Sequence, residues 1–458
     1  MAAQELSYIR NFQVNFQGYP PLQTITERYL SMKFKLTALE KQWILYDVGN
    51  SAFILLVSTI IPIYFNYLAD NANISSVNYL AYWGYAASIS TILVALIGPI
   101  AGTISDTRSY KKKFFILSIG VGIAGCIILG FLHSWIWFLG IFIITKVGYS
   151  SANIFYDSML TDITVSERMD RVSSHGYAWG YIGSCIPFIA SLGLVLGAGK
   201  LGLTMTQAMA MAFCIVAVWW LVSSLPLIKN YRQIHYVEKS GNAAKESFGR
   251  LFRTLKDMKR QKHIFMFLLA FFFYIDGVYT IIDMATAYGT SLGLDTTGLL
   301  LALLLTQIVA FPCVLIFARI AQKQDTTRLI SICIAAYLGI TLFAMQLDSQ
   351  LEFWILAICV GMFQGTVQAL SRSFFAKIIP PDKSGEYFGI LDICGKGASF
   401  LGTTLVSIIS QITGKVNLGV GALAIMFILG FVFFRRAVRL TKELQSSQSE
   451  PDTMTTTS

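Results

Sequence analysis

Long apolar runs, each of the length that crosses a lipid bilayer, recur along this chain from about Trp43 to Leu440. Hydrophobic residues make up 55% of the 458 residues and charged residues only 13%, whereas a soluble domain carries about 25% charged residues. The bilayer interior offers no water to unpaired backbone groups, and the runs are too continuously apolar for barrel strands. The sequence therefore predicts an all-α membrane protein.

One polar segment, residues 229–263, divides the apolar sequence into two stretches of similar length. It holds ten Lys/Arg against three acids, which is +7 of the chain's formal net charge of +10. We interpret it as a basic cytoplasmic linker between two six-helix bundles at 43–228 and 264–440, preceded by an N-terminal segment (1–42) and followed by a disordered tail (441–458). The twelve predicted spans are 43–68, 77–104, 114–132, 135–157, 173–198, 206–228, 264–288, 297–320, 327–346, 351–376, 385–411 and 416–438.

The charge of the short turns alternates from one side of the predicted membrane to the other. Basic residues fill the turns on the side of the linker and of both termini, and the opposite turns contain only Lys200 and Lys415. The positive-inside rule therefore places both termini and the linker in the cytoplasm, which requires an even number of spans. Residues 22–41 fit either an amphipathic helix lying on the membrane or a disordered tail.

Motifs typical of enzymes fail in this sequence context. A GxGxxG pattern at Gly120–Gly125 falls inside the third predicted span, where small residues serve helix packing. The seven Cys lie in apolar runs without a CxxC pair, and the four His are scattered. We therefore expect no enzyme activity, no cofactor and no metal. The basic balance lies where membrane topology requires it, so no nucleic-acid partner is expected.

Charged residues inside the spans are the first candidates for a solute or proton pathway. Each costs about 2.5–3.5 kcal/mol near a helix centre, so it usually faces a polar cavity or a partner. Each also has a structural alternative, such as an ion pair between Asp276 and Lys146 or between Asp392 and Lys396, which lie four residues apart. The pathway candidates are Asp276, Lys146, Asp47, Asn50, Asp392, Lys396, Gln364 and Gln368.

The two apolar stretches look like repeats of one unit. Tyr46-Asp47 in the first span matches Tyr274 and Asp276 in the seventh. The exits of spans 4 and 10 align so that Asp157 and Asp162 of one half correspond to, and face, Arg372 and Lys377 of the other. Two six-helix repeats around an axis normal to the membrane are the architecture of a rocker-type transporter.

The segment from Gly102 to Lys113 resembles the loop between the second and third helices of the major facilitator superfamily, although Thr107 and Ser109 depart from that pattern. Three further stretches, 43–53, 160–183 and 368–389, together closely resemble the branch that contains fungal vacuolar amino-acid effluxers of autophagy and their bacterial relatives. The resemblance implies a twelve-helix transporter with a cytoplasmic gate. The gate candidates are Gly102, Asp106, Arg108, Asp157, Asp162, Arg171, Arg372 and Glu386.

The sequence and the resemblance lead to a functional hypothesis with two alternatives. We expect a monomeric secondary transporter in the bilayer of a bacterial plasma membrane, moving a small polar solute such as an amino acid by alternating access, with protons as the coupling ion. The first alternative is an exporter of amphipathic compounds, such as drugs, bile-type detergents or lysolipids. The second is a membrane sensor or scaffold that transports nothing.

Overall fold

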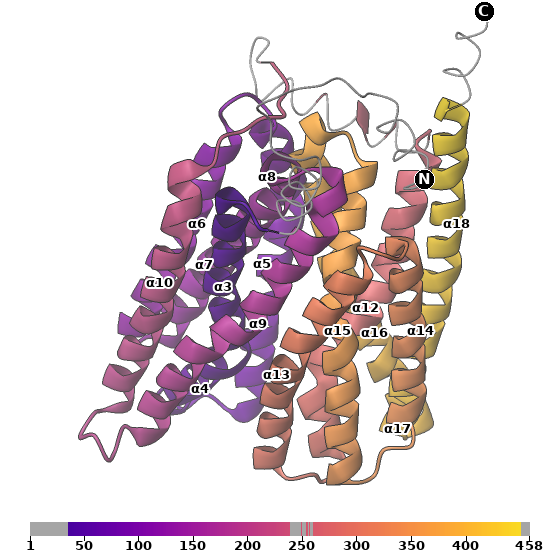
Figure 1. Ribbon diagram of the computed structural model, residues 1–458. Coiled ribbons are helices and arrows are strands. Elements are labelled where there is room, and N and C mark those ends of the chain that lie inside the picture. The colour runs from indigo at the N-terminus through magenta and orange to yellow at the C-terminus, as the bar shows by residue number, and fades with distance from the viewer. Residues whose placement is uncertain (1–34, 239–248, 250–252, 255, 257–259, 450–458) are drawn as a thin grey trace, which may run out of the picture. The chain divides into compact units, whose positions relative to one another are not determined.

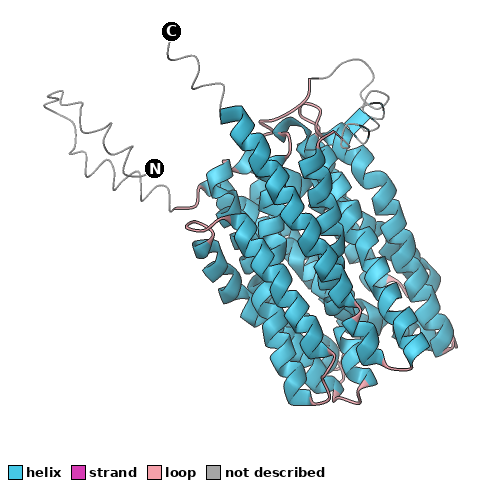
Figure 2. Ribbon diagram, turned by 90° about the vertical axis from the view of Figure 1, so that its right-hand side faces the viewer, coloured by secondary structure: helices cyan, strands magenta, loops and turns pink. Residues whose placement is uncertain are grey.

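The computed structural model describes residues 35–238, 249, 253–254, 256 and 260–449. The described residues from Leu39 onward belong to one compact unit. The described part is helical apart from one β-bridge between Thr107 and Val237, and Figure 2 shows its helices running alongside one another. The predicted amphipathic segment, up to residue 34, and most of the linker lie outside the described residues.

Eleven helical stretches of the described residues are long and apolar enough to cross a bilayer. In the first half of the chain the helices are α3 (Ala38–Leu55), η1 (Leu56–Ile60), α4 (Ile61–Asn71), α5 (Ser76–Ser105), α6 (Lys111–Phe131), α7 (Trp135–Ser158), α8 (Leu160–Ile163), α9 (Ser166–Gly197) and α10 (Met205–Asn230). In the second half they are α12 (Lys262–Ser291), α13 (Thr296–Ile320), α14 (Thr326–Ala344), α15 (Gln350–Ile378), η2 (Pro381–Lys383), α16 (Ser384–Thr413), α17 (Val416–Gly421) and α18 (Leu423–Ser449).

The membrane-spanning helices follow the predicted spans, but several extend further. α3 begins at Ala38 instead of residue 43, and α9 begins at Ser166 instead of residue 173. The tail predicted as disordered from residue 441 is helical as far as Ser449, which corrects that prediction. Hydropathy marks only the part of a helix that lies in lipid, and the backbone ladder continues through polar residues beyond it. The eleven stretches leave the twelve-span count a prediction.

Local sequence explains several helix ends. Thr204 accepts a hydrogen bond from the backbone N–H of Gln207, whose side chain bonds the Thr204 N–H in return, so a capping box starts α10. Gly414 ends α16 in the left-handed conformation at φ +66°, which glycine adopts without strain. η1 is a π-helical turn just before Pro62, whose ring cannot accept a regular helical neighbour four residues earlier.

The helices form two groups that follow the order of the chain, α3–α10 and α12–α18 (Figure 1). The contacts between the groups are made mainly by α5 with α16, α9 with α13 and α15, and α7 with α16, with a smaller one between α8 and α15. We call the end of the helices where α10 stops at Asn230 and α12 starts at Lys262 the linker end, and the opposite end the far end. That the two groups act as separate six-helix bundles remains a prediction.

Candidate functional site

At the linker end, α5 and α16 come into backbone contact. A Cβ atom on Gly389 would lie 2.8 Å from the carbonyl oxygen of Gly98, and one on Gly102 would overlap the carbonyl of Gly385. Small residues permit this approach in membrane helices. The close packing of these four glycines joins the two groups of helices, and any larger side chain here would push them apart.

Asp106 lies just past the end of α5 and caps the first turn of α16 from the other group. Its Oδ1 accepts from the backbone N–H of Gly385 at 2.8 Å, and its Oδ2 accepts from that of Glu386 at 2.9 Å. A carboxylate is favoured there because the exposed N–H groups and the helix dipole make the N-terminus positive. The carboxylate is fully buried, and both of its bonds join the first group of helices to the second.

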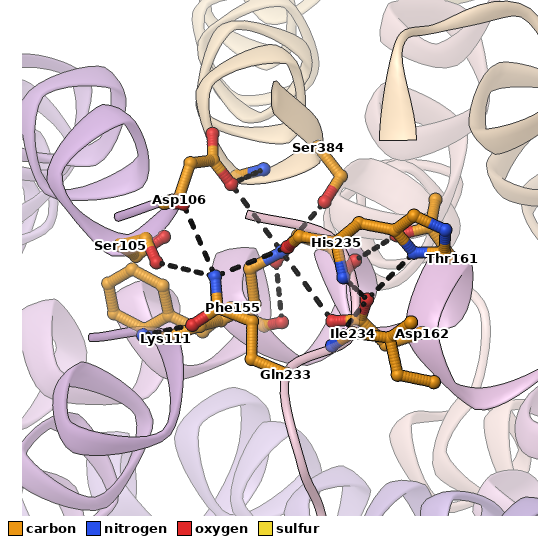
Figure 3. A network of polar contacts seen from close by, with 12 residues as sticks. Ser105, Asp106, Lys111, Phe155, Thr161, Asp162, Gln233, Ile234, His235 and Ser384 are labelled. Carbon is orange, nitrogen blue, oxygen red and sulfur yellow. Dashed lines mark hydrogen bonds and ion pairs between the residues drawn. The ribbon is translucent and has the colours of Figure 1, made fainter. Parts of the chain in front are cut away.

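Lys111 supplies the positive charge next to this cap. Its Nζ lies 3.4 Å from Asp106 Oδ1 and 3.9 Å from Asp162 Oδ2, and it donates to Ser384 Oγ at 2.7 Å (Figure 3). The side chain is fully buried. A buried ammonium requires such partners, because its desolvation is costly. Lys111 therefore ties α6 to both α8 and α16.

The described start of the linker crosses the same end of the first group as an extended strap, which we define as residues 231–238. Asp162 Oδ1 accepts from the backbone N–H of Ile234 at 3.2 Å and of His235 at 2.8 Å (Figure 3). Its Oδ2 accepts from the Tyr231 hydroxyl at 2.5 Å. Val237 N–H donates to the Asp106 carbonyl at 2.8 Å, which forms the bridge to Thr107.

The His235 ring adds a titratable contact to the strap. Its Nδ1 lies 3.0 Å from Asp162 Oδ1. The hydrogen bond to the Asp162 carboxylate raises the pKa of His235 above its ordinary value. The protonated imidazole is the form that this carboxylate favours.

Arg372, deeper along α15, joins the two groups through α3, α7 and α9. Its Nη1 donates to Asp157 Oδ1 at 2.8 Å, its Nε donates to Ser173 Oγ at 2.9 Å, and its Nη2 lies 3.5 Å from Asp47 Oδ2. Its guanidinium carbon stands 4.4 Å from the ring centre of Tyr177 and 4.6 Å from that of Trp43. Fork-shaped donors and flat faces suit a guanidinium well, and an ammonium much less.

A second ion pair between the two groups, of the same polarity as Arg372–Asp157, lies nearer the linker end. Asp170 on α9 accepts from Ser373 Oγ at 2.6 Å and from Lys377 Nζ at 2.5 Å, both on α15. Its Oδ2 also accepts from Thr326 Oγ1 of α14 at 2.5 Å. In both ion pairs the first group of helices supplies the carboxylate, Asp157 or Asp170, and α15 of the second group supplies the cation.

A cavity of about 400 Å³ lies between the groups on the far side of Arg372. Ligand sites in proteins usually measure about 300–1,000 Å³. Five of the pathway candidates line it: Asp47, Asn50, Gln364, Gln368 and Asp392. Arg372 and Asp157 form part of its wall, and Tyr149, Tyr177, Tyr181 and Tyr279 add aromatic faces with hydroxyl groups.

Three other pathway candidates lie elsewhere or outside the description. Asp276 is fully buried between α12 and α16, where Oδ1 accepts from Gly402 N–H at 3.0 Å and from Thr280 Oγ1 at 3.2 Å. Lys146 stands with Nζ 5.9 Å from the ring centre of Phe142. The side chain of Lys396 is outside the described residues. The ion pair considered between Asp276 and Lys146 does not form.

The gate candidates also separate by location. Gly102, Asp106, Asp157, Asp162, Arg372 and Glu386 are gathered at or near the linker-end contacts. Arg108 instead pairs with Glu238 of the strap at 3.3 Å, where both side chains are well exposed, and lies over the Tyr236 ring. Such an exposed pair adds little stability. The alignment set Asp162 opposite Lys377, but Asp162 binds the strap and Lys377 binds Asp170.

Two carboxylates, one at the cavity and one between the groups of helices, escaped the sequence reasoning. Asp283 lines the cavity from α12, within electrostatic range of Lys146. It lies two helical turns beyond Asp276 in the same apolar run, so its sequence position was a usable signal. Asp170 sits among charged neighbours at the start of α9, where a polar run is typical of a solvated loop. No signal in the sequence distinguishes it from those neighbours.

Comparison with known proteins agrees with this geometry. Residues 39–446 match the family described as vacuole effluxer Atg22 like. The uncharacterized MFS-type transporter YxiO of Bacillus subtilis is 39% identical over 406 residues, which cover 88% of this chain and 95% of that protein. Autophagy-related protein 22 of Cryptococcus neoformans is 26% identical over 302 residues, 61% of this chain and 51% of the fungal protein. This chain thus matches about half the length of the fungal relative.

Among solved structures, the fucose:proton symporter FucP of E. coli superposes with a TM-score of 0.67 at 15% identity, covering 87% of this chain and 97% of that one. Together with the 39% identical MFS-type relative, the eleven membrane-length helical stretches identify a multi-pass membrane transporter of the major facilitator superfamily. Within that superfamily the chain belongs to the Atg22-like family, which includes bacterial relatives.

Proposed function

We propose that this protein exports a small zwitterionic solute, such as an amino acid, by alternating access. One observation carries the proposal: the two groups of helices are tied together at the linker end while a charged and polar cavity lies beyond the tie. A carrier needs a site that is reached from one face at a time, and a sealed end next to a lined cavity meets that need. The domains 43–228 and 264–440 are the proposed moving bodies.

The cavity wall supports a zwitterionic solute because it carries both signs of charge. Arg372 is the group suited to a carboxylate, and Asp283 and Asp392 of the same lining suit an ammonium. The amides of Gln364 and Gln368 and the tyrosine hydroxyls offer uncharged donors and acceptors. The direction is proposed from the effluxer description of the family, and protons are the proposed coupling ion because four carboxylates line or approach the cavity: Asp47, Asp157, Asp283 and Asp392.

The setting of the transporter is also part of the proposal. We place twelve helices in a bacterial plasma membrane, with both termini and the linker in the cytoplasm, in a monomer. The basic turns at the linker end support this orientation, and the Bacillus subtilis relative supports the compartment. In this orientation the described conformation is closed toward the cytoplasm.

Counterflow in proteoliposomes tests the function. Purified protein is reconstituted with an internal amino-acid mixture, and uptake of each labelled amino acid is measured with and without an imposed pH gradient. We expect saturable uptake of at least one amino acid, reduced at least tenfold by Asp392→Asn and unchanged by Lys200→Gln, which replaces an exposed side chain outside the cavity.

The same preparation decides between the alternatives. The aromatic lining of the cavity also favours amphipathic compounds, so lysolipids and detergent-like drugs are included as competitors. Transport of these compounds without any amino-acid flux would replace the proposed substrate class. The absence of flux across the whole panel, with correctly folded protein, would reject the carrier proposal.

A further inference from the structure

A basic cleft opens at the linker-end tips of α14 and α18, away from the cavity and from the gate. It measures about 1110 Å³. Five cationic side chains line it against two carboxylates, Asp325 and Glu443. Lys442 Nζ pairs with Asp325 at 3.1 Å and Arg439 Nε pairs with Glu443 at 2.8 Å. The remaining three cations, Arg328, Arg435 and Arg436, form no ion pair with any residue in the described part of the chain.

The exposed arginines continue a surface stripe of α18 that is apolar further down the helix. Ile425, Ile428 and Val432 are 54%, 49% and 56% exposed, and each lies three or four residues from the next. Arg435 and Arg436 follow one turn later, about 6 Å along the axis at 1.5 Å per residue. On α14, the exposed Ile332 likewise lies one turn further from the cleft than Arg328.

This order fixes the depth of the cleft in the membrane. In a membrane transporter the exposed apolar side chains of a spanning helix face acyl chains, so cations one turn beyond them reach the level of the phosphate groups. Guanidinium groups bind phosphate oxygens in a bidentate manner, and basic pockets between spanning helices hold anionic headgroups. The apolar stripe that leads into the cleft suits the acyl chains of a lipid, which a soluble phosphate lacks.

We propose that the cleft binds the phosphate headgroup of an anionic phospholipid, with its acyl chains along the exposed faces of α14 and α18. Arg328, Arg435 and Arg436 contact the phosphate, while Arg439 and Lys442 exchange their carboxylate partners for it or stay paired. The site is independent of the transported solute. It fastens the ends of α14 and α18 to one leaflet at the second group of helices.

Native mass spectrometry of the full-length protein, released from nanodiscs of phosphatidylglycerol or of phosphatidylcholine, tests this site. We expect phosphatidylglycerol to stay bound when phosphatidylcholine has dissociated. The triple variant R328Q/R435Q/R436Q loses this preference, at about fivefold in affinity for each arginine removed. The control K113Q/K229Q/K323Q removes the same charge from exposed positions outside the cleft and keeps the preference.

Three results would overturn the proposal. Equal retention of both lipids by the wild-type protein needs no variant and denies a headgroup site. Equal loss in the triple variant and in the control shows a diffuse charge effect. A thermal shift with inorganic phosphate in detergent as large as that with dispersed phosphatidylglycerol shows a site for any phosphate.

Discussion

Arg372 is the residue that most directly links the cavity to the closed linker end. It lines the cavity and at the same time pairs with Asp157 and Asp47 of the other group. A solute carboxylate that competes with Asp157 for this guanidinium would loosen one inter-group tie as it binds. Substrate binding and opening of the gate would then share one charged group, which is the differential contact that a two-state carrier requires.

Replacement of Arg372 by Gln is expected to destabilise the described state strongly. Asp157 and Asp47 would be left as buried carboxylates without their counter-charge, and loss of one partner of a buried pair costs about 3–5 kcal/mol. The double variant R372Q/D157N recovers part of this loss, because one of the stranded charges is gone. Unfolding free energies in mixed detergent and SDS micelles measure the effect. Lys200→Gln, at an exposed position, serves as control, and an equally small change in R372Q and in the control would contradict the argument.

At the residue scale, the sequence predicted which charged residues lie within the helices better than it predicted the ion-pair partner of each. Asp157 and Arg372 were aligned across the two halves, and they do meet. Asp162 and Lys377 were aligned by the same rule and each found another partner. A repeat alignment gives two residues similar depths in the bilayer, but contact depends on the helix face that each occupies, and a shift of about two residues turns a side chain to the opposite face. Asp276, placed mid-span by hydropathy, turns into its own group for this reason.

At the scale of elements, the α5–α16 contact is expected to control which end of the transporter is closed. Gly102→Val places a side chain where the Gly385 carbonyl lies. Overpacking of this kind costs about 1–3 kcal/mol, so the population open at the linker end should rise at least about fivefold. Gly193→Val is the matched control, because no atom lies within 4 Å of the added Cβ.

Maleimide labelling of Ser384→Cys, in a background without the native cysteines, reports this opening, since Ser384 is fully buried at the linker end. We expect faster labelling with Gly102→Val and the original rate with Gly193→Val. If both glycine variants label at the same rate, the α5–α16 contact does not hold the end closed.

The strap should hold more firmly at low pH. Its hydrogen bond to Asp162 raises the pKa of His235 in the folded protein. Stability from a raised pKa is fully present below the unfolded value, about 6.5 for histidine, and disappears as the pH rises through the folded value. The melting temperature of the wild-type protein should therefore exceed that of His235→Gln most below pH 6.5, and the gap should narrow above it.

The exposed His133 at the start of the α6–α7 connection provides a comparison for the same pH series. His133→Gln serves as the control for replacing a histidine that does not contact the strap. A difference between wild type and His235→Gln that stays constant from pH 5 to 9 would show that the His235–Asp162 contact does not titrate.

The elements themselves could be predicted from the sequence to different degrees. Apolar runs gave the positions of the spanning helices, because the bilayer permits few other structures. The strap could not be predicted, because residues 231–238 look like any solvated basic loop until Asp162 and Asp106 are placed beside them. The extension of α9 back to Ser166 was missed for the same reason, since its first two turns are polar.

For the whole molecule, the contacts at the two ends of α16 bear on topology. At its start, Ser384 bonds Lys111 at the linker end. Just past its end, Asn417 donates to the Met345 carbonyl at the C-terminus of α14. α14 begins next to Asp325, which pairs with Lys442 at the linker-end tip of α18. The other end of α14, at Met345, therefore lies at the far end. These contacts support α16 as a further crossing in addition to the eleven stretches.

Reporter fusions test that count. With twelve crossings and a cytoplasmic linker end, alkaline phosphatase fused after Gly414 should be active, because this position lies outside the cytoplasm. The same enzyme fused after Ser449 should be inactive, and green fluorescent protein fused there should fluoresce. With eleven crossings Ser449 would lie outside the cytoplasm, so alkaline phosphatase fused there would be active and green fluorescent protein would not fluoresce. A basic linker end facing outward would reverse all three signals, contrary to the positive-inside distribution of charge on these turns.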